Sequence, residues 1–178
     1  MLKMKSGYNT TIPVASSIIT MPIKNNVTRL LDSRKVAYTT AEYDGAQFHS
    51  ADEVAQLIGV PVDQVYKTIV VLREDKTRKP LLVMVAADRE IDLKVLAASL
   101  GEKKLRVAKH DEAEKLTGLQ VGGISAIALL SKPFEVCLDR PALDFEHIHI
   151  SGGQRGLDVK IGVKDLMTLT KAKTVEAT

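Results

Sequence analysis

A lysine inside an apolar stretch is the first residue of this sequence that suggests chemistry. The segment DQVYKTIVVL, residues 63–72, is typical of a buried β-strand, and strand alternation places Lys67 on one face with Val65 and Ile69. A buried ammonium group without a partner is costly. Either its stem packs on the core while its charged end reaches water, or the side chain enters a pocket and holds an anionic or carbonyl-bearing ligand. The residues alone leave both interpretations open.

Two glycine pairs could contribute backbone groups to such a pocket. In VGGISA, residues 121–126, adjacent glycines let backbone N–H groups approach a ligand, and the apolar run AIALL after them could begin a helix. In ISGGQRGLD, residues 150–158, a hairpin turn explains the glycines but does not require Ser151, Arg155 or Asp158. A tight turn is the alternative in both cases. Neither stretch matches GxxxxGK[ST] or the GxSxG nucleophile elbow.

The remaining candidates for chemistry have simpler explanations. His147 and His149 share one face of a strand and could reach one metal ion, but zinc needs further ligands. Two exposed histidines on a half-buried strand are therefore the favoured interpretation. Cys137 has no neighbouring base or cation in the sequence, so a small buried filler is predicted. We predict neither a metal site nor a cofactor.

The predicted helices and strands that position these residues have clear start and stop signals in the sequence. Ser50 and Glu53 form a predicted capping box for a helix that ends at Gly59, and Asp92 and Gly101 bound another. The strand around Lys67 and the strand LLVMVAA are joined by the polar turn REDKTRKP, which predicts a hairpin. Further helices are predicted over residues 111–118 and 163–170, and further strands in AYTTAEYD, KLRVAK, FEVCLD, HIHIS and LDVKIG. This order favours a mixed α/β (α+β) domain whose largely antiparallel or mixed sheet could curl into a barrel, and it disfavours a doubly wound nucleotide fold.

Composition narrows the classes of function. The chain has 178 residues, 45% hydrophobic and 26% charged, which suits one globular domain. Its net charge of +3 is compatible with a nucleic-acid partner, and the string Lys103, Lys104 and Arg106 could contact a phosphate backbone, although a solvated face is the alternative. One cysteine excludes an internal disulfide and favours a cytoplasmic location. No apolar run has the length of a membrane helix.

The chain is expected to divide into three parts. Residues 1–20 form a loosely ordered N-terminal extension, residues 21–172 form the patterned domain, and residues 173–178 form a tail that frays. Met21 immediately precedes the patterned sequence and could be the true start.

Three motifs in register resemble those of one known family. DQVYKT, VGGIS and SGGQRGLD, in this order and spacing, resemble the YbaK/EbsC family of aminoacyl-tRNA deacylases, which includes the editing domain inserted in some prolyl-tRNA synthetases. The resemblance covers residues 21–170. It implies a compact mixed α/β fold with a curved sheet and flanking helices. It also implies trans-editing hydrolysis of Cys, Ala or a similar small residue from tRNA(Pro), with aminoacyl-tRNA and prolyl-tRNA synthetase as partners.

The resemblance assigns roles to individual residues. The family's lysine falls on Lys67, and its glycine loop supplies Gly122 and Gly123 as catalytic backbone groups. An aminoacyl ester is already activated, so an enzyme needs only to position it and stabilise an oxyanion. Water or the terminal ribose hydroxyl would serve as nucleophile or proton relay. The residues expected to bind substrate are Thr68, Ile124, Ser125, Ala126, Ser151, Gly152, Gly153 and Asp158.

One departure from the family pattern affects the glycine loop. Ala126 stands where the family commonly has proline, and Ala128 where it often has glycine. Proline would fix the loop's φ angle, so alanine could loosen the loop or reshape the amino-acid pocket. The alternative function is a non-catalytic module on the same fold that binds nucleotides or tRNA ends.

Overall fold

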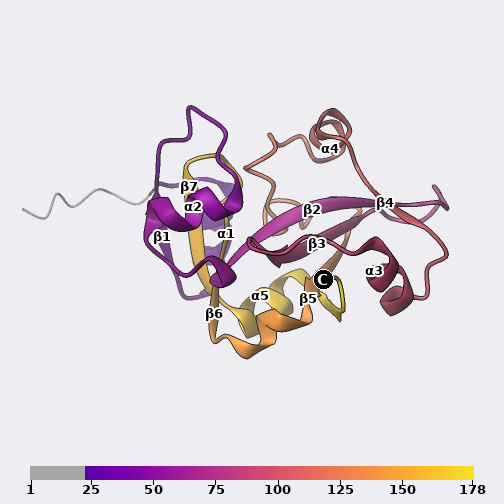
Figure 1. Ribbon diagram of the computed structural model, residues 1–178. Helices are drawn as coiled ribbons and strands as arrows, with labels where there is room; N and C mark the ends of the chain where they lie inside the picture. Colours follow the sequence, from indigo (N-terminus) through magenta and orange to yellow (C-terminus); the bar gives the residue numbers. More distant parts are fainter. Residues whose placement is uncertain (1–22) are drawn as a thin grey trace, which may run out of the picture.

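The computed structural model describes residues 23–178, so the predicted N-terminal extension over residues 1–20 lies outside the described part (Figure 1). Helices and short 3-10 turns are interspersed with strands along this part. The helical segments are α1 (Asn26–Ser33), α2 (Ala51–Ile58), η1 (Val62–Gln64), α3 (Leu93–Leu100), α4 (His110–Thr117), η2 (Arg140–Asp144) and α5 (Val163–Thr170). The strands are β1 (Tyr38–Glu42), β2 (Val65–Arg73), β3 (Leu81–Ala86), β4 (Leu105–Val107), β5 (Glu135–Asp139), β6 (His147–Ser151), β7 (Leu157–Gly162) and β8 (Lys173–Val175).

Within residues 23–178 the strands form one mixed sheet in the order β1-β7-β6-β2-β3-β5-β8, with β4 attached to β2. The predicted hairpin is confirmed, because β2 and β3 pair antiparallel with Lys67 opposite Val85. The β2–β6, β3–β5 and β5–β8 pairs are parallel. The predicted mixed α/β class is therefore confirmed. The sheet remains open, with β1 and β8 at its ends, so it does not curl into a barrel.

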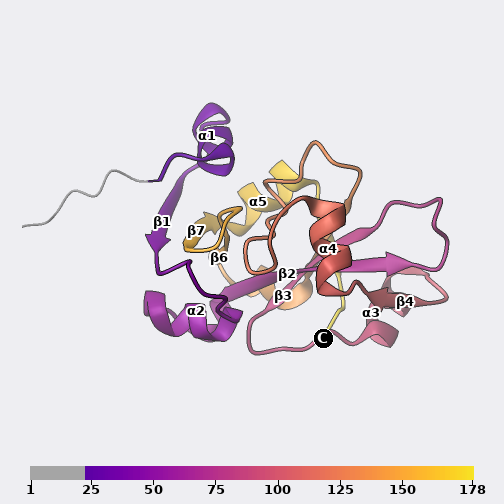
Figure 2. The ribbon, with the colours of Figure 1, turned by 90° about the horizontal axis from the view of Figure 1, so that it is seen from above.

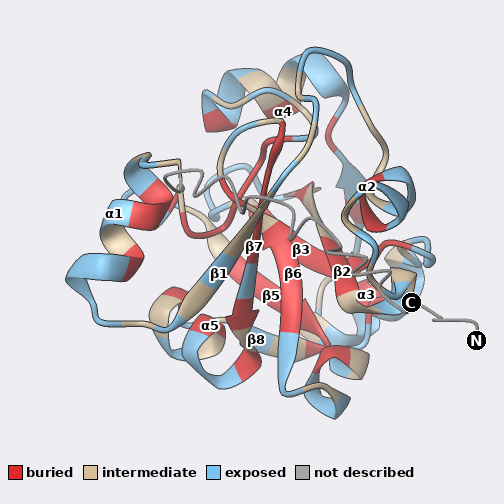
Figure 3. Ribbon diagram, turned by 90° about the vertical axis from the view of Figure 1, so that its left-hand side faces the viewer, coloured by how far each residue is buried: buried red, intermediate tan, exposed pale blue. Residues whose placement is uncertain are grey.

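Both faces of the central β2–β3 pair are covered (Figure 3). On one face, Tyr66 and Val70 join a core that includes residues of α1, α4 and α5. On the other face, Val71 packs in a second cluster with Leu96 of α3, and Val65 packs with Ala55 of α2. Figure 1 accordingly shows α3 and α4 on opposite sides of this pair. Lys67 belongs to the face that α2 and α3 cover.

Local capping signals fix the helix ends as the sequence predicts. The Ser50 N–H donates to Glu53 Oε2 at 2.9 Å, and Gly59 ends α2 in the left-handed conformation. Asp92 Oδ1 accepts from the Lys94 and Val95 N–H groups at the start of α3. Seen from above, α2 lies beside the first part of β2 and α4 beside its later part (Figure 2). The strand that carries Lys67 is thus fixed along its length.

Two predictions about local order are wrong. The apolar run AIALL forms turns rather than a helix, because its side chains enter the core around Ile127 and Leu129 without regular helical bonding. The tail from residue 173 does not fray: β8 pairs with β5, and Val175 and Ala177 are buried. The Ala177 N–H also donates to Asp139 Oδ1 at 2.8 Å. Within the described residues, no helix is long and apolar enough to span a membrane.

Candidate active site

The candidate site begins at a gap in the sheet beside β2. Strand β6 pairs with Val65 and Tyr66, and β4 pairs with the same strand only from Val71 onward. Val70 directs its carbonyl to this edge, where it accepts from the Ala108 N–H at 2.9 Å. Since backbone groups of alternate residues point to the same edge of a strand, the Thr68 N–H and C=O also face the gap. Because β6 and β4 pair with different parts of β2, the edge of β2 at Thr68 between them is unpaired.

A cavity of about 310 Å³ lies at this gap. Its walls come from the segment before α2, the first half of β2, the 121–124 loop and the facing ends of β6 and β7. The sequence-predicted residues that line it are Lys67, Thr68, Gly122, Ile124, Ser151 and Asp158. Residues from all three sequence motifs thus surround one hollow.

Lys67 reaches the cavity with a half-buried side chain. Its ammonium donates to Glu90 Oε1 at 3.0 Å and lies 3.4 Å from the Ala87 carbonyl. The Lys67 side chain is 24% exposed, whereas that of Glu90 is 91% exposed. An ion pair with so exposed a partner is weak. The Lys67 ammonium is therefore held only weakly by Glu90.

A carboxylate lines the same cavity as this lysine. In the β6–β7 ladder Ser151 pairs with Asp158, so both side chains share a face, and the β2–β6 pairing puts that face on the Lys67 side. Asp158 is 3% exposed and accepts from His149 Nδ1 at 2.6 Å. Burial raises the pKa of the Asp158 carboxyl, and the hydrogen bond with His149 opposes that rise. The cavity thus has one cationic wall and one acidic wall.

The histidine pair does not match the prediction of two exposed side chains. His147 is exposed, but His149 is 7% exposed because its side chain, on the face opposite to that of Ile148, packs against Asp158 of β7. No group of three or more His, Cys, Asp or Glu side chains suited to a metal ion occurs in the described residues. His149 therefore lies behind the acidic wall of the cavity, in contact with Asp158.

Gly122 and Gly123, the first glycine pair, have different roles at the cavity. Gly122 lines the cavity with φ +92°, a conformation that favours glycine, and a Cβ there would lie 3.2 Å from the Phe48 ring. The Gly123 N–H is already used, since it donates to the Gln120 carbonyl at 2.8 Å. A Cβ on Gly123 would also lie 3.0 Å from the Arg155 backbone nitrogen. Gly122 thus borders the cavity, while Gly123 allows two loops to pack closely.

The other predicted binding residues support the cavity from outside its wall. Ser125 and Ala126 are each 1% exposed, and the Ser125 hydroxyl has no hydrogen-bond partner among the described residues. Gly152 leaves room for Leu157, and the Gly153 N–H donates to Ser151 Oγ at 3.2 Å. The two glycines therefore shape the turn that orients Ser151.

Sequence reasoning missed an aromatic rim around the opening. Phe48 is 50% exposed at the cavity, and the Arg155 guanidinium carbon lies 5.6 Å from its ring centroid. Arg155 Nε donates to the Val121 carbonyl at 2.8 Å, which ties the two glycine loops together. The available signal was a single aromatic residue in the polar segment GAQFHS before the capping box of α2.

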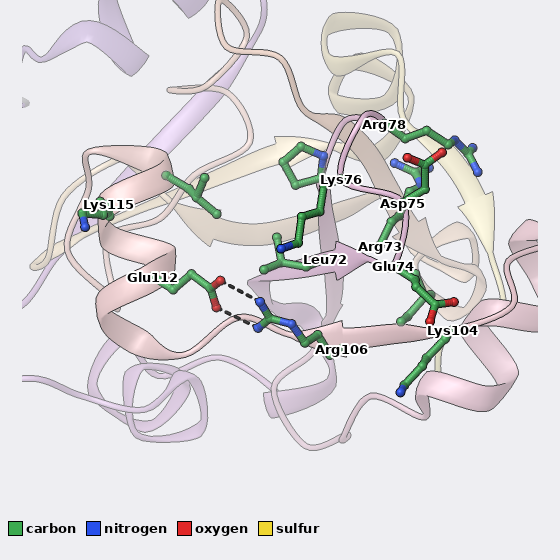
Figure 4. A pocket seen from close by; sticks show the side chains of 13 residues that line it. Leu72, Arg73, Glu74, Asp75, Lys76, Arg78, Lys104, Arg106, Glu112 and Lys115 are labelled. Carbon is green, nitrogen blue, oxygen red and sulfur yellow. Dashed lines mark hydrogen bonds and ion pairs between the residues drawn. The ribbon is translucent and has the colours of Figure 1, made fainter.

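A second and larger cavity, of about 580 Å³, lies farther along β2 between the β2–β3 turn, β4 and α4 (Figure 4). Lys67 in the first cavity and Arg73 in the second are six residues apart, so these two residues lie about 20 Å from each other along the strand. Lys76, Lys104 and Lys115 are exposed at this second cavity. Of the predicted phosphate-contacting string, Lys104 and Arg106 line it and Lys103 does not.

Arginines in the second cavity are held by acidic neighbours. Arg106 forms a two-pronged pair with Glu112 at 2.7 and 2.8 Å, as Figure 4 shows. Buried Arg73 pairs at 2.7 Å with both Glu102 and Glu135. The second cavity is larger, but the lysine, carboxylate, hydroxyl and free backbone edge gather in the first, which we therefore take as the candidate active site.

Cys137 plays no part in either cavity. It is fully buried in the cluster beside α3, and burial raises the pKa of its thiol to about 11. A thiol in that environment is a poor nucleophile near neutral pH. The structure confirms the predicted buried filler.

Comparison with known proteins gives the family. The family model of the aminoacyl-tRNA editing domain matches residues 46–169. EbsC of Enterococcus faecalis, named as a Cys-tRNA(Pro)/Cys-tRNA(Cys) deacylase, is 31% identical over 156 residues, 87% of this chain and 93% of the relative. The prolyl-tRNA editing protein ProX of Acetoanaerobium sticklandii is 28% identical, covering 85% of this chain and 93% of ProX. A crystal structure described as a trans-editing enzyme for prolyl tRNA synthetase superposes with a TM-score of 0.72 at 25% identity, over 88% of this chain and 98% of its own.

The chain belongs to the aminoacyl-tRNA editing domain family. Its fold and its relatives place it among the aminoacyl-tRNA deacylases, which are hydrolases.

Proposed function

We propose that the cavity beside Lys67 hydrolyses the ester of a mischarged tRNA, with cysteine or another small amino acid on tRNA(Pro) as the preferred substrate. The main observation that supports this proposal is that one cavity is lined by Lys67, Thr68, Gly122, Ser151 and Asp158. The names of the relatives EbsC and ProX support tRNA(Pro) as the carrier. As a partner we propose prolyl-tRNA synthetase, in the cytoplasm where tRNA is charged.

The geometry supports electrostatic catalysis on a positioned ester. The Lys67 ammonium leaves Glu90 and contacts the ester or the terminal phosphate, and the Asp158 carboxylate receives the substrate α-ammonium group. Backbone N–H groups of Thr68 and Gly122 are the candidate donors to the developing oxyanion, because the Gly123 N–H is engaged by Gln120. Gly123 therefore moves from the catalytic set to a supporting role.

The chemical step needs no protein nucleophile. Water adds to the ester carbonyl carbon, the bond from that carbon to the ribose oxygen breaks, and the ribose oxygen takes up a proton. The terminal ribose hydroxyl next to the ester can relay that proton. Ser151 Oγ, oriented by the Gly153 N–H, contacts the amino-acid side of the substrate. Ala126, at the family's usual proline position, acts indirectly because it is buried outside the cavity wall.

Substrate choice is tested with Cys, Ala, Ser and Pro, each esterified to tRNA(Pro), and with Cys on tRNA(Cys). We expect release of one small amino acid from tRNA(Pro) faster than release of proline, because the cavity is only about 310 Å³ and also receives the terminal nucleotide. Equal rates for proline and the small amino acids would contradict an editing function. Binding of tRNA ends without release would favour the non-catalytic module.

The second cavity supplies a separate prediction about tRNA affinity. We propose that its exposed lysines contact acceptor-stem phosphates about 20 Å from Lys67 along β2. Replacing Lys76, Lys104 and Lys115 together by alanine should weaken binding of uncharged tRNA and lower the slope of log affinity against log salt by roughly 2–3. Filter binding between low and moderate salt measures both.

The matched control for this prediction carries the same charge change elsewhere. It replaces Arg34, Lys94 and Lys164, which are exposed on or beside α1, α3 and α5 and lie outside both cavity walls. An equal loss of salt dependence in the control would mean that net charge, rather than the second cavity, governs tRNA binding.

A further inference from the structure

A buried contact stands directly behind the acidic wall of the cavity. Asp158 lines the cavity, whereas His149 contacts Asp158 from the neighbouring strand and is not part of the cavity wall. The distance from His149 Nδ1 to Asp158 Oδ1 is 2.6 Å, with side-chain exposures of 9% and 3%. Asp158 Oδ2 has no hydrogen-bond partner among the described residues, and it is not one of their fully buried unpaired side-chain atoms. One oxygen is thus fixed by His149, and the other is left for a ligand.

We infer that His149 is a positioning residue, which orients the Asp158 carboxylate so that its free oxygen receives the α-ammonium group of the aminoacyl ester. This inference rests on the proposed deacylase function. It adds to that function the residue that holds the amine-binding carboxylate in place. His149 acts through Asp158 and does not itself contact the substrate.

The register of the sheet makes this arrangement rigid. His149 pairs with Val65 on one side and with Lys160 on the other, while Asp158 pairs with Ser151 and with Ala41 of β1. Both backbones are therefore held by strands on two sides. A short charge-assisted hydrogen bond between side chains fixed in this way restricts the carboxylate rotation that would otherwise move the free oxygen.

The electrostatic role of His149 follows from burial. Burial raises the pKa of Asp158 and favours its neutral form, whereas the hydrogen bond with His149 lowers that pKa. A neutral Asp158 would lose its attraction for an ammonium group. The other charged and titratable groups that line the cavity are Tyr43, His49, Asp52, Tyr66, Lys67 and Glu90, and Arg155 and Lys160 lie beside it. The direct hydrogen bond with Asp158 is made by His149 rather than by any of these groups.

Two substitutions separate the hydrogen bond from mere packing. His149→Phe fills the space but removes the donor, and His149→Asn keeps an N–H donor near the position of Nδ1. We expect His149→Phe to lower kcat/KM on the preferred aminoacyl-tRNA by roughly ten- to a hundredfold, and His149→Asn to recover most of it. In His149→Phe the acidic limb of the kcat/KM profile should also move to higher pH, since Asp158 loses the bond that lowers its pKa.

A binding measurement isolates the ammonium contact. Wild type should bind an adenosine that carries a non-hydrolysable 3′-alanylamide more tightly than the matching 3′-propionylamide, which lacks the amine. His149→Phe should lose this preference and His149→Asn should retain it. Thermal unfolding of each variant identifies any loss of fold.

The matched control lies on the same strand. His147→Phe changes an exposed histidine two residues earlier and should leave the rate, the pH profile and the preference for the amine unchanged. If folded His149→Phe behaves like His147→Phe, or if His149→Asn is as impaired as His149→Phe, this inference is wrong while the deacylase function stands. Absence of hydrolysis by wild type would overturn the proposed function and this inference with it.

Discussion

Replacing Lys67 by alanine should lower kcat/KM for aminoacyl-tRNA hydrolysis by at least about a hundredfold, the loss typical for removal of one transition-state donor. The reason is that Lys67 supplies an ammonium group to the cavity that Asp158 also lines. Folding should be almost unaffected, since the Lys67 ion pair is made with a glutamate that is 91% exposed. Initial rates of amino-acid release and urea unfolding of the same preparation measure the two quantities.

Two further variants define what Lys67 does. Lys67→Met keeps the unbranched stem without the charge, so it should be as inactive as Lys67→Ala. Glu90→Gln removes the present partner of Lys67 and should leave activity at or above the wild-type level, because it frees the ammonium. If Glu90→Gln is as inactive as Lys67→Ala, the ion pair itself would be the functional unit, and direct contact of Lys67 with substrate would be excluded.

The largest effect on stability should come from Arg73. Its side chain is 2% exposed and pairs with Glu102 and Glu135, and its Nη1 donates to the Lys79 carbonyl. Arg73→Met should lower the free energy of unfolding by about 3 kcal/mol, because Glu102 and Glu135 lose their buried partner and keep only the more exposed Arg78 and Lys173. Urea unfolding near neutral pH measures this loss. Adding Glu102→Leu to Arg73→Met should restore part of the stability, whereas an equal or greater loss would contradict the argument.

The Arg73 network also predicts how stability depends on pH. Burial alone would raise the pKa of Glu135, but hydrogen bonds from Lys173 and Arg73 outweigh it and leave that pKa below its ordinary value. The stability that Glu135 contributes is therefore complete above its pKa in the unfolded chain, and it is lost as pH falls through the lowered value. In Arg73→Met this acid-dependent part of the stability should shrink.

Local signals in the sequence predicted many of the helices and strands that position the site. The capping box at Ser50 and Glu53, the ends of the helix from Asp92 to Gly101, and the strand that carries Lys67 all depend on residues near one another in the chain. Pattern and capping are sufficient for such elements. Three motifs far apart in the chain also contain half of the residues that line the cavity.

The parts that the sequence did not predict depend on distant contacts. The gap beside Thr68 exists because β6 and β4 reach the same edge of β2 and then diverge, which no local pattern encodes. The burial of His149 rather than His147 depends on the neighbouring strands β2 and β7. The ordered tail likewise depends on β5, to which β8 pairs across more than thirty residues of chain.

The central claim is that the cavity beside Lys67 catalyses hydrolysis of an aminoacyl-tRNA ester. The most direct test is release of free amino acid from Cys-, Ala- and Ser-tRNA(Pro) at neutral pH, under multiple turnover, by wild type and Lys67→Ala. We predict that wild type releases at least one of these amino acids well above the spontaneous rate and that Lys67→Ala falls close to that rate. Release by wild type no faster than spontaneous hydrolysis on all three substrates, or full activity in Lys67→Ala, would contradict the claim.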